Sequence, residues 1–222
     1  AMYAVMGTKL VTVNPDKTVT VLGDVGAGGW CTFDYSFDRL AVSSGGRFYY
    51  WNGVLTQVTD PDLGTVIDFC WMDGYFLTTD GVNIVQTELN DPTQVDPLKY
   101  GSSEYDPDKV VRLLKYKNEL VAVNRYSIEF FQDVGGSGFA FQRIPGAVIQ
   151  RGALGTYACI KYEDAIAFVG SRRNESASVF MVQNGVETEV ATREVQTILQ
   201  GYTEAELSTI VLDARTDKDF SH

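Results

Sequence analysis

Acidic residues gather at three places where neighbouring carboxylates could act together. Asp60-Pro61-Asp62 and Asp106-Pro107-Asp108 each hold two carboxylates, and Asp213 to Asp219 carries three acids around Arg215 and Lys218. Paired carboxylates can perform glycoside hydrolysis or bind Ca²⁺. However, no DxDxDG calcium loop with a terminal Glu is present, and Asp-Pro is a routine turn dipeptide. We therefore interpret these segments as solvated turns.

Histidine and cysteine chemistry is sparse in this chain. The one histidine is His222, the last residue, which removes Ser-His triads and His-ligated zinc. Cys31, Cys70 and Cys159 are odd in number and far apart, so neither a zinc site nor a disulfide framework is indicated. We expect three small apolar core residues and a reducing compartment during assembly.

Glycine-rich, arginine-containing and aromatic segments are the remaining candidates for binding sites. Gly26–Gly29 and Gly135–Gly138 lack the spacing of phosphate-binding loops and are expected to be hairpin or connecting loops. Arg172-Arg173, the one adjacent arginine pair, could make a local phosphate contact. Tyr49-Tyr50-Trp51 and Phe130-Phe131 are expected to pack in the core or between blades. The sequence assigns no catalytic residue, no cofactor-binding residue and no metal ligand.

Composition narrows the functional class. Of 222 residues, 45% are apolar and 21% charged, which are globular values. The net charge of -11 argues against a surface that coats nucleic acid, since such a surface needs excess positive charge. No run of about 18 apolar residues exists, so no membrane span is predicted.

Short apolar strands alternate with glycine-containing turns and recur as pairs. The first members of the pairs start at residues 3, 40, 76, 120 and 166, so the steps are 37, 36, 44 and 46 residues. Steps of that size with about four strands each are typical of a β-propeller blade. The alternative is an irregular β-sandwich. The predicted pairs are 3–5 with 10–12, 40–42 with 48–50, 76–78 with 84–86, 120–122 with 128–130, and 166–168 with 180–182.

The five pairs predict an all-β fold with about five visible blades, possibly part of a larger propeller. The first unit lacks its leading strand, and residues 171–176 look like a loop insertion in the fifth. The apolar run Thr209–Leu212 could be a leading strand. It would close a five-bladed ring beside residues 3–5, or begin a further blade.

Two short helices are expected near residues 193–208. Val195, Ile198 and Leu199 share one helical face, and Gly201 follows as a stop. Thr203 and Glu206 form a capping box for the second helix.

The chain ends suggest a fragment. Residue 1 is Ala, strand-like sequence starts at once, and the chain stops soon after an apolar run. We expect residues 1–222 to be a single propeller domain of a longer protein.

Several segments in the second half resemble one family in their order and spacing. The most specific piece is Gln150-Arg151-Gly152-Ala153-Leu154-Gly155-Thr156-Tyr157. The others are Tyr105–Asp108, Ser127–Phe131, Ser178–Val182 and Ile198–Leu207. Together they are similar to the packaged-DNA stabilisation protein of short-tailed bacteriophages, also called a tail accessory or head-completion factor. The resemblance is continuous from about residue 95 to 219 and weaker but collinear before that.

The resemblance implies a non-enzymatic structural protein of the virion. Such proteins assemble in the bacterial host cytoplasm as a homo-oligomeric ring below the portal protein. They close or extend the DNA exit channel and offer a platform for the tail needle and tailspikes. Packaged DNA would pass nearby without sequence-specific binding. No site residue is carried over from the family.

A second function class stays open at this point. A propeller can also serve as a glycan-binding or glycosidase module, which a pocket with convergent carboxylates and stacked aromatic rings would favour. A generic adaptor that binds peptides is a third possibility.

Overall fold

The computed structural model describes residues 2–214, 216–217 and 220–221. Arg215, Lys218, Asp219 and His222, which were considered above, lie outside the described residues. The chain divides into two compact units, Ala1–Asp80 with Val85–Lys99, and Gly81–Ile84 with Tyr100–His222. The organisation as one propeller domain stays a prediction.

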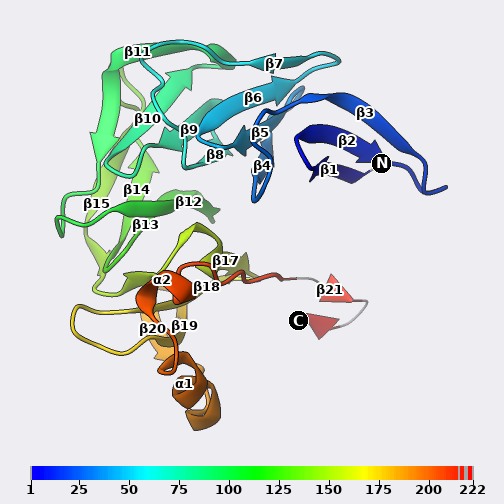
Figure 1. Ribbon diagram of the computed structural model, residues 1–222. Helices are drawn as coiled ribbons and strands as arrows, with labels where there is room; N and C mark the ends of the chain where they lie inside the picture. The colour runs from blue at the N-terminus through cyan, green and yellow to red at the C-terminus, as the bar shows by residue number, and fades with distance from the viewer. Residues whose placement is uncertain (1, 215, 218–219, 222) are drawn as a thin grey trace. The chain divides into compact units, whose positions relative to one another are not determined.

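Antiparallel sheets follow one another along the chain (Figure 1). In the first unit, the first sheet has three strands in chain order: β1 (Met2–Met6), β2 (Lys9–Val13) and β3 (Val19–Asp24). The second sheet has four, also in chain order: β4 (Thr32–Tyr35), β5 (Leu40–Ser44), β6 (Arg47–Trp51) and β7 (Leu55–Gln57).

The third sheet has the order β11-β10-β9-β8. Its strands are β8 (Asp68–Met72), β9 (Tyr75–Thr79), β10 (Asn83–Glu88) and β11 (Asp91–Ser102). The long strand β11 was not predicted, because Pro92 and Pro97 interrupt its pattern. It lies at the edge of the sheet, where a missing N–H leaves the ladder intact.

The second unit holds the fourth sheet, in chain order, and the fifth sheet, in the order β16-β18-β19-β20 with β17 also paired to β18. The strands of the fourth are β12 (Val110–Tyr116), β13 (Glu119–Asn124), β14 (Ile128–Asp133) and β15 (Phe141–Ile149). Those of the fifth are β16 (Gly152–Ala153), β17 (Cys159–Tyr162), β18 (Ala165–Ser171), β19 (Ser178–Gln183) and β20 (Val186–Glu189). A 3₁₀ turn, η1 (Thr156–Ala158), precedes β17, and β21 (Thr216–Asp217) pairs with β22 (Phe220–Ser221).

All five predicted strand pairs are confirmed as neighbouring antiparallel strands. In the first and fifth pairs the predicted residues face each other, as Ala4 faces Val11. In the pairs that begin at residues 40 and 120 the partner strand is displaced by one residue, since Leu40 faces Trp51 and Leu120 faces Phe131. Three of the hairpin turns, Gly45-Gly46, Asp73-Gly74 and Asn184-Gly185, have positive φ at both central residues. This is the backbone of a type I′ turn, which suits the twist of antiparallel strands.

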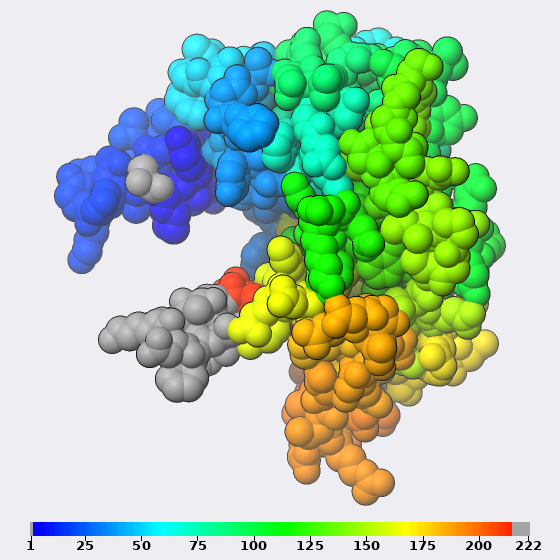
Figure 2. All heavy atoms as spheres, turned by 180° about the vertical axis from the view of Figure 1, so that it is seen from behind, coloured from blue at the N-terminus to red at the C-terminus, as the bar shows by residue number. Residues whose placement is uncertain are grey.

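The predicted helices are confirmed as α1 (Arg193–Leu199) and α2 (Glu204–Leu207). Thr203 and Glu206 make the predicted capping box. The helix α1 ends with Gln200 as its C-cap, and Gly201 follows directly, as predicted, although Gly201 does not adopt a positive φ. In Figure 2 the end of the second unit that carries β20 and α1 is coloured orange and lies at the surface.

Each core cluster lies between two neighbouring layers of one unit. Val5, Leu10 and Val42 are in a cluster between the first and second sheets, and Phe48, Phe69 and Phe76 in one between the second and third. In the second unit, one cluster joins the fourth and fifth sheets. A further cluster packs Val169 and Val179 of the fifth sheet against Leu199, Leu207, Ile210 and Leu212.

The run Thr209–Leu212, which the sequence offered as a possible leading strand, is therefore not a strand. The segment has no regular structure, and the Leu212 N–H donates to the Tyr157 carbonyl at 2.9 Å. Its apolar side chains cover the fifth sheet, so burial explains the hydrophobic run without strand pairing. The predicted insertion is confirmed, since residues 172–177 connect β18 to β19.

Candidate functional site

The segments that carry the family resemblance converge in the second unit around four arginines. This arginine cluster consists of Arg125, Arg151, Arg172 and Arg173. They come from the β13–β14 turn, the residue before β16, and the β18–β19 loop. Residues far apart in the sequence thus meet where the loops of the fourth and fifth sheets come together.

Arg151 is the most buried member, with 8% of its surface exposed. Its Nε lies 2.8 Å from Glu187 Oε1, and its Nη1 lies 2.8 Å from Glu175 Oε2. Its guanidinium carbon is 3.8 Å from the centre of the Phe180 ring. A guanidinium suits this place because its planar face stacks on a ring while its edge reaches two carboxylates.

Tyr126 lies between two other members of the cluster. The guanidinium carbons of Arg125 and Arg173 are 4.3 and 4.5 Å from its ring centre. Arg125 Nε bonds Glu204 Oε1 at 2.8 Å, which ties α2 to the β13–β14 turn. Arg173 bonds both oxygens of Asp106, at 2.7 and 3.1 Å.

The pKa values of the two carboxylates in the Asp106-Pro107-Asp108 turn are shifted in opposite directions. The Arg173 hydrogen bond lowers the pKa of Asp106. Burial raises the pKa of Asp108, against the hydrogen bond from the Tyr126 N–H. That N–H lies 2.5 Å from Asp108 Oδ2, and the Ser127 hydroxyl lies 3.3 Å from Oδ1. Asp108 therefore fixes the turn that presents Tyr126.

Two fully buried polar side chains, Glu129 and Asn124, hold the same loops in place through hydrogen bonds. Glu129 accepts hydrogen bonds from the Ser103 hydroxyl and, at 3.0 Å, from the Tyr105 N–H. Asn124 donates to the hydroxyls of Ser103 and Ser127, at 2.6 and 2.9 Å. These bonds hold the segment after β11 against the β13–β14 hairpin.

The glycines of the segment Gln150–Tyr157 are explained by close backbone approach. A Cβ on Gly152 would lie 2.5 Å from the carbonyl carbon of Arg125 and the nitrogen of Tyr126. A Cβ on Gly155 would meet the carbonyl oxygen of Ser208. Only glycine lets these backbones touch, so the segment that resembles the family most specifically is a packing element.

The arginine cluster can hold loops together but offers little for chemistry. Its guanidinium groups face Asp106, Glu175, Glu187 and Glu204, so their charges are balanced within the protein. Arg172 also donates to the carbonyl of Gln150 at 3.1 Å. These contacts favour a structural interpretation of Arg172-Arg173 over a phosphate contact.

The other acidic residues that the sequence offered as candidates do not gather into one site in the described part of the chain. Asp60 accepts hydrogen bonds from the N–H groups of Asp62 and Val95, at 2.9 and 3.1 Å, and so forms a turn, as expected. Among the described residues, no group of three or more side chains is arranged to hold a metal ion.

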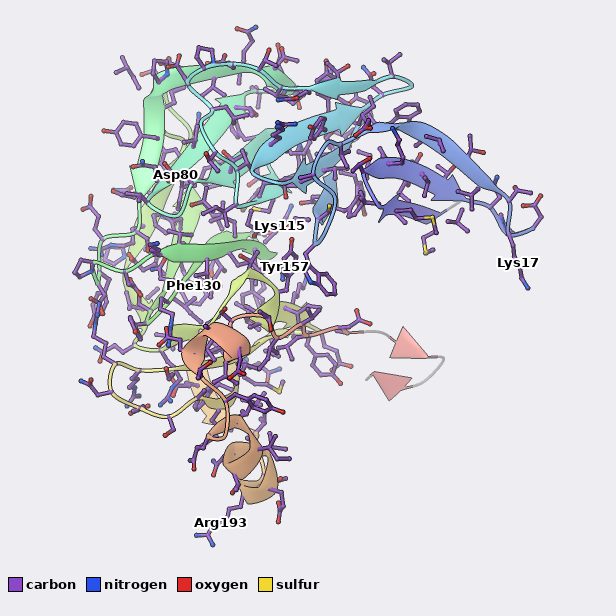
Figure 3. All side chains as sticks on the ribbon, viewed as in Figure 1. Lys17, Asp80, Lys115, Phe130, Tyr157 and Arg193 are labelled. Atoms are coloured by element: carbon purple, nitrogen blue, oxygen red, sulfur yellow. The ribbon has the colours of Figure 1, made fainter. Side chains whose placement is uncertain are left out.

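The expectations for the cysteine and aromatic residues are confirmed in part. Tyr49 is buried, and Tyr50 and Trp51 are partly buried against the clusters between neighbouring sheets. Cys70 and Cys159 are buried, but Cys31 is only half-buried, because it lies at the rim of the cluster between the first two sheets. Phe130 and Phe131 are 5% and 3% exposed, and Phe130 lies among the strands of the fourth sheet (Figure 3).

Two pockets bear on the alternative function as a glycan-binding or glycosidase module. One of about 540 Å³ lies along β3, β6 and β7 and includes Arg47, Trp51 and a single carboxylate, Asp24. That carboxylate is bound by Lys9 and by the Gly26 N–H. The other, of about 280 Å³, includes one carboxylate, Glu119. Neither pocket has the convergent carboxylates that would favour a glycosidase.

Sequence reasoning missed the roles of Arg151 and Glu129. Both residues lie in segments that carry the family resemblance, but the sequence assigned no role to either of them. The available signal was a charged residue inside an apolar run, as in Ile128-Glu129-Phe130. A charge in such a place is buried only with partners, and those partners are far away in the sequence.

Known proteins that are similar to this chain include a phage tail protein. The chain is 26% identical over 232 aligned residues to the "Tail hub protein gp10" of Salmonella phage P22, covering 96% of this chain and 48% of that protein. The chain thus spans about half the length of this curated relative. Among solved structures, it resembles the extracellular domain of a one-component system from B. thetaiotaomicron. The TM-score is 0.52 at 9% identity, over 86% of this chain and 26% of that one, which concerns the fold alone.

In the part of the chain that the structure describes, no helix is long and apolar enough to cross a membrane. The model of one protein family matches residues 1–222, and its description names a β-propeller, which confirms the predicted fold. The chain belongs to the phage stabilisation family, described as Bacteriophage P22 Gp10, beta-propeller.

Proposed function

We propose that this chain is part of a structural, non-enzymatic protein in the tail hub of a short-tailed phage. It is assembled in the bacterial host cytoplasm and lies below the portal protein in the virion. There it closes or extends the DNA exit channel, retains the packaged DNA, and provides a platform for the needle and tailspikes. The full-length protein forms a homo-oligomeric ring and is longer than residues 1–222.

The observation that carries this proposal is the family match over the whole chain. The relative in phage P22 is a tail hub protein. The arginine cluster supports a structural role, because its guanidinium groups form ion pairs that join loops within the protein.

The negative net charge of the chain supports a role in the wall of a channel through which DNA can move. Each phosphate that a protein neutralises strengthens its hold on DNA, so a channel wall should carry few free cations. A net charge of -11 suits such a wall. We therefore propose that packaged DNA passes nearby without sequence-specific binding.

Immunogold electron microscopy with an antibody against residues 1–222 tests the location. We expect label at the vertex between head and tail. Label at the spike tips, or on no particle, would contradict the proposal.

A conditional mutant of the gene tests DNA retention. We expect particles without the protein to package DNA and then lose it, and a plasmid copy to restore retention. Particles that keep their DNA without the protein would refute the retention role.

A further inference from the structure

The pocket of about 540 Å³ contains two hydrogen-bond donors that the fold does not use. It lies within the first unit, between β3 and β7, the last strands of the first and second sheets (Figure 1). The strand β6 also lines it, whereas β1 contributes nothing to the lining. Its volume is within the range of about 300–1,000 Å³ that is common for ligand pockets.

One face of β6 supplies three side chains to this pocket. Arg47, Tyr49 and Trp51 alternate along the strand, so they lie on the same side of the second sheet. Leu55 and Gln57 of β7 face Trp51 and Tyr49 in the ladder and line the pocket as well. A guanidinium, a phenol and an indole therefore form one row in the pocket.

Tyr49 is almost wholly buried, yet its hydroxyl has no partner within the protein. Only 4% of the residue is exposed. In the described part of the chain, no group makes a hydrogen bond with the hydroxyl. The oxygen is open to the pocket rather than enclosed. Because the hydroxyl of a buried tyrosine usually has a partner, an acceptor bound in the pocket would satisfy it.

Arg47 is the second donor, and it lies near the Tyr49 hydroxyl. The residue is exposed, and its guanidinium forms no ion pair with any described residue. A Cβ on Gly26 would lie 2.6 Å from Arg47 Nη1 and 3.3 Å from the Tyr49 hydroxyl oxygen. Both groups thus lie against the same main-chain position, within reach of one small ligand group. Their approach also explains why residue 26 is a glycine.

The one carboxylate that lines the pocket is already paired. Asp24 accepts hydrogen bonds from the Lys9 ammonium and from the Gly26 N–H, at 2.5 and 2.7 Å. The bond from Lys9 lowers the pKa of Asp24, and Lys9 balances its charge. A guanidinium and a hydroxyl that both donate into one pocket favour an anion, and a guanidinium fits a carboxylate with two parallel hydrogen bonds.

The edge of β7 beside the pocket presents unpaired main-chain groups. The Val58 N–H donates to the Phe48 carbonyl at 2.9 Å, which makes these residues a hydrogen-bonded pair. Because antiparallel pairs alternate, Leu55 and Gln57 direct their N–H and C=O groups away from β6. Within the described ranges, β7 pairs with β6 alone. An extended peptide can therefore bond to β7 as an added strand.

Aliphatic side chains form the rest of the wall. Leu22, Val54 and Leu55 line the pocket beside the Trp51 ring, and Val54 is 67% exposed. An apolar side chain of a ligand would cover them. A sugar would instead need polar partners for its several hydroxyl groups, which this wall does not offer. The pocket therefore suits a peptide with an acidic and an apolar side chain.

We propose that this pocket binds an acidic side chain on an extended peptide of another tail protein. The carboxylate accepts hydrogen bonds from Arg47 and Tyr49, an adjacent apolar side chain covers Leu22 and Val54, and the peptide main chain pairs with β7. The proposal rests on the proposed function, in which the protein is a platform for other tail proteins. Charge complementarity selects the ligand, because the guanidinium has no carboxylate of its own.

Tyr49→Phe separates a role in binding from a role in folding. The change keeps the ring and removes a hydroxyl that bonds no described group, so its loss leaves no partner unsatisfied. We expect the Tm of the full-length protein to stay at or above that of the wild type. A loss of more than about 2 °C would show that the hydroxyl serves the fold and would overturn the proposal.

A peptide array tests the ligand. The probes are overlapping 12-residue peptides that cover the other tail proteins of the same phage, each beside a copy with Asn and Gln in place of Asp and Glu. We expect binding only by peptides that carry an acid near an apolar residue. Arg47→Gln should weaken their binding to the full-length protein at least ~10-fold, and Tyr49→Phe about 3-fold, because each removes a hydrogen bond to a charged group.

Arg193→Gln is the matched control, since it removes the same charge from an exposed arginine on α1 in the second unit (Figure 3). We expect this variant to bind the peptides as the wild type does. An array without binders, or binding that survives Arg47→Gln or the loss of the peptide's acid, would overturn the proposal. Binding of glucuronic acid that depends on Arg47, without peptide binding, would assign the pocket to an acidic sugar and overturn it. The immunogold label tests the tail-hub location separately.

Discussion

Gly152 gives the sharpest test of the packing between the fourth and fifth sheets. We expect Gly152→Ala to destabilise the protein strongly. The added Cβ would lie 2.0 Å from the Asn124 carbonyl oxygen and 2.5 Å from Arg125 C and Tyr126 N. A carbon atom normally stays at least about 3.3 Å from a carbonyl oxygen, so one backbone must move by about 1.3 Å. The obstacle is main chain, which cannot rotate away as a side chain could.

The size of the effect follows from this displacement. Overpacking a close-packed site costs about 1–3 kcal/mol, and an immovable obstacle places this case near about 3 kcal/mol. The entropy that alanine removes from the unfolded chain returns only about 0.4–1 kcal/mol. The net cost is then about 2–2.6 kcal/mol. With about 2–4 °C of Tm per kcal/mol for a chain of this size, the expected loss is about 4–10 °C.

Thermal and urea unfolding followed by circular dichroism measure this loss. Gly138→Ala is the matched control, since a Cβ there meets nothing within 4 Å. We expect the control to melt at or slightly above the wild-type temperature. If Gly152→Ala melted within about 2 °C of wild type, the close-approach argument would be refuted.

Three further predictions concern the charged and thiol groups. Arg151→Ala should cost about 2 kcal/mol in urea unfolding, because it removes the guanidinium that lies 2.8 Å from both Glu175 and Glu187 and leaves them only Arg172, at 3.8 Å. Arg172→Ala, at a half-exposed side chain, should cost much less. The lowered pKa of Asp106 contributes stability that is present above its usual value of 3.8 and is lost as the pH falls through the folded pKa. Asp106→Asn should therefore flatten the acid side of a Tm–pH curve, and an unchanged curve would count against the Arg173 contact. Burial raises the pKa of the Cys31 thiol, so native alkylation should be slow at neutral pH and faster in alkali, with further reaction only on unfolding at the buried thiols, Cys70 and Cys159.

Much of the fold could be predicted from local pattern. Alternating apolar residues and turn dipeptides such as Asp73-Gly74 identify the hairpins, because a side-chain period of two and a positive φ are properties of neighbouring residues. The capping box at Thr203 is equally local. The resemblance segments also pointed to the family before any contact was known.

Contacts between distant segments were beyond that reasoning. The apolar run at Thr209–Leu212 fits a strand as well as it fits a covering segment, and only its packing on Val169 and Val179 decides between them. Likewise, the pairing of Asp106 with Arg173 joins residues 67 positions apart. A charge pattern along the chain does not say which opposite charge will be near in space.

The sequence alone determined the strand pairs, the helix caps and the family, because each depends on residues close together in the chain. Only the tertiary structure decided that Arg151 and Gly152 are packing elements, and that Thr209–Leu212 covers the fifth sheet. Burial and backbone contact arise when separate hairpins meet, and no local pattern records which surfaces will do so.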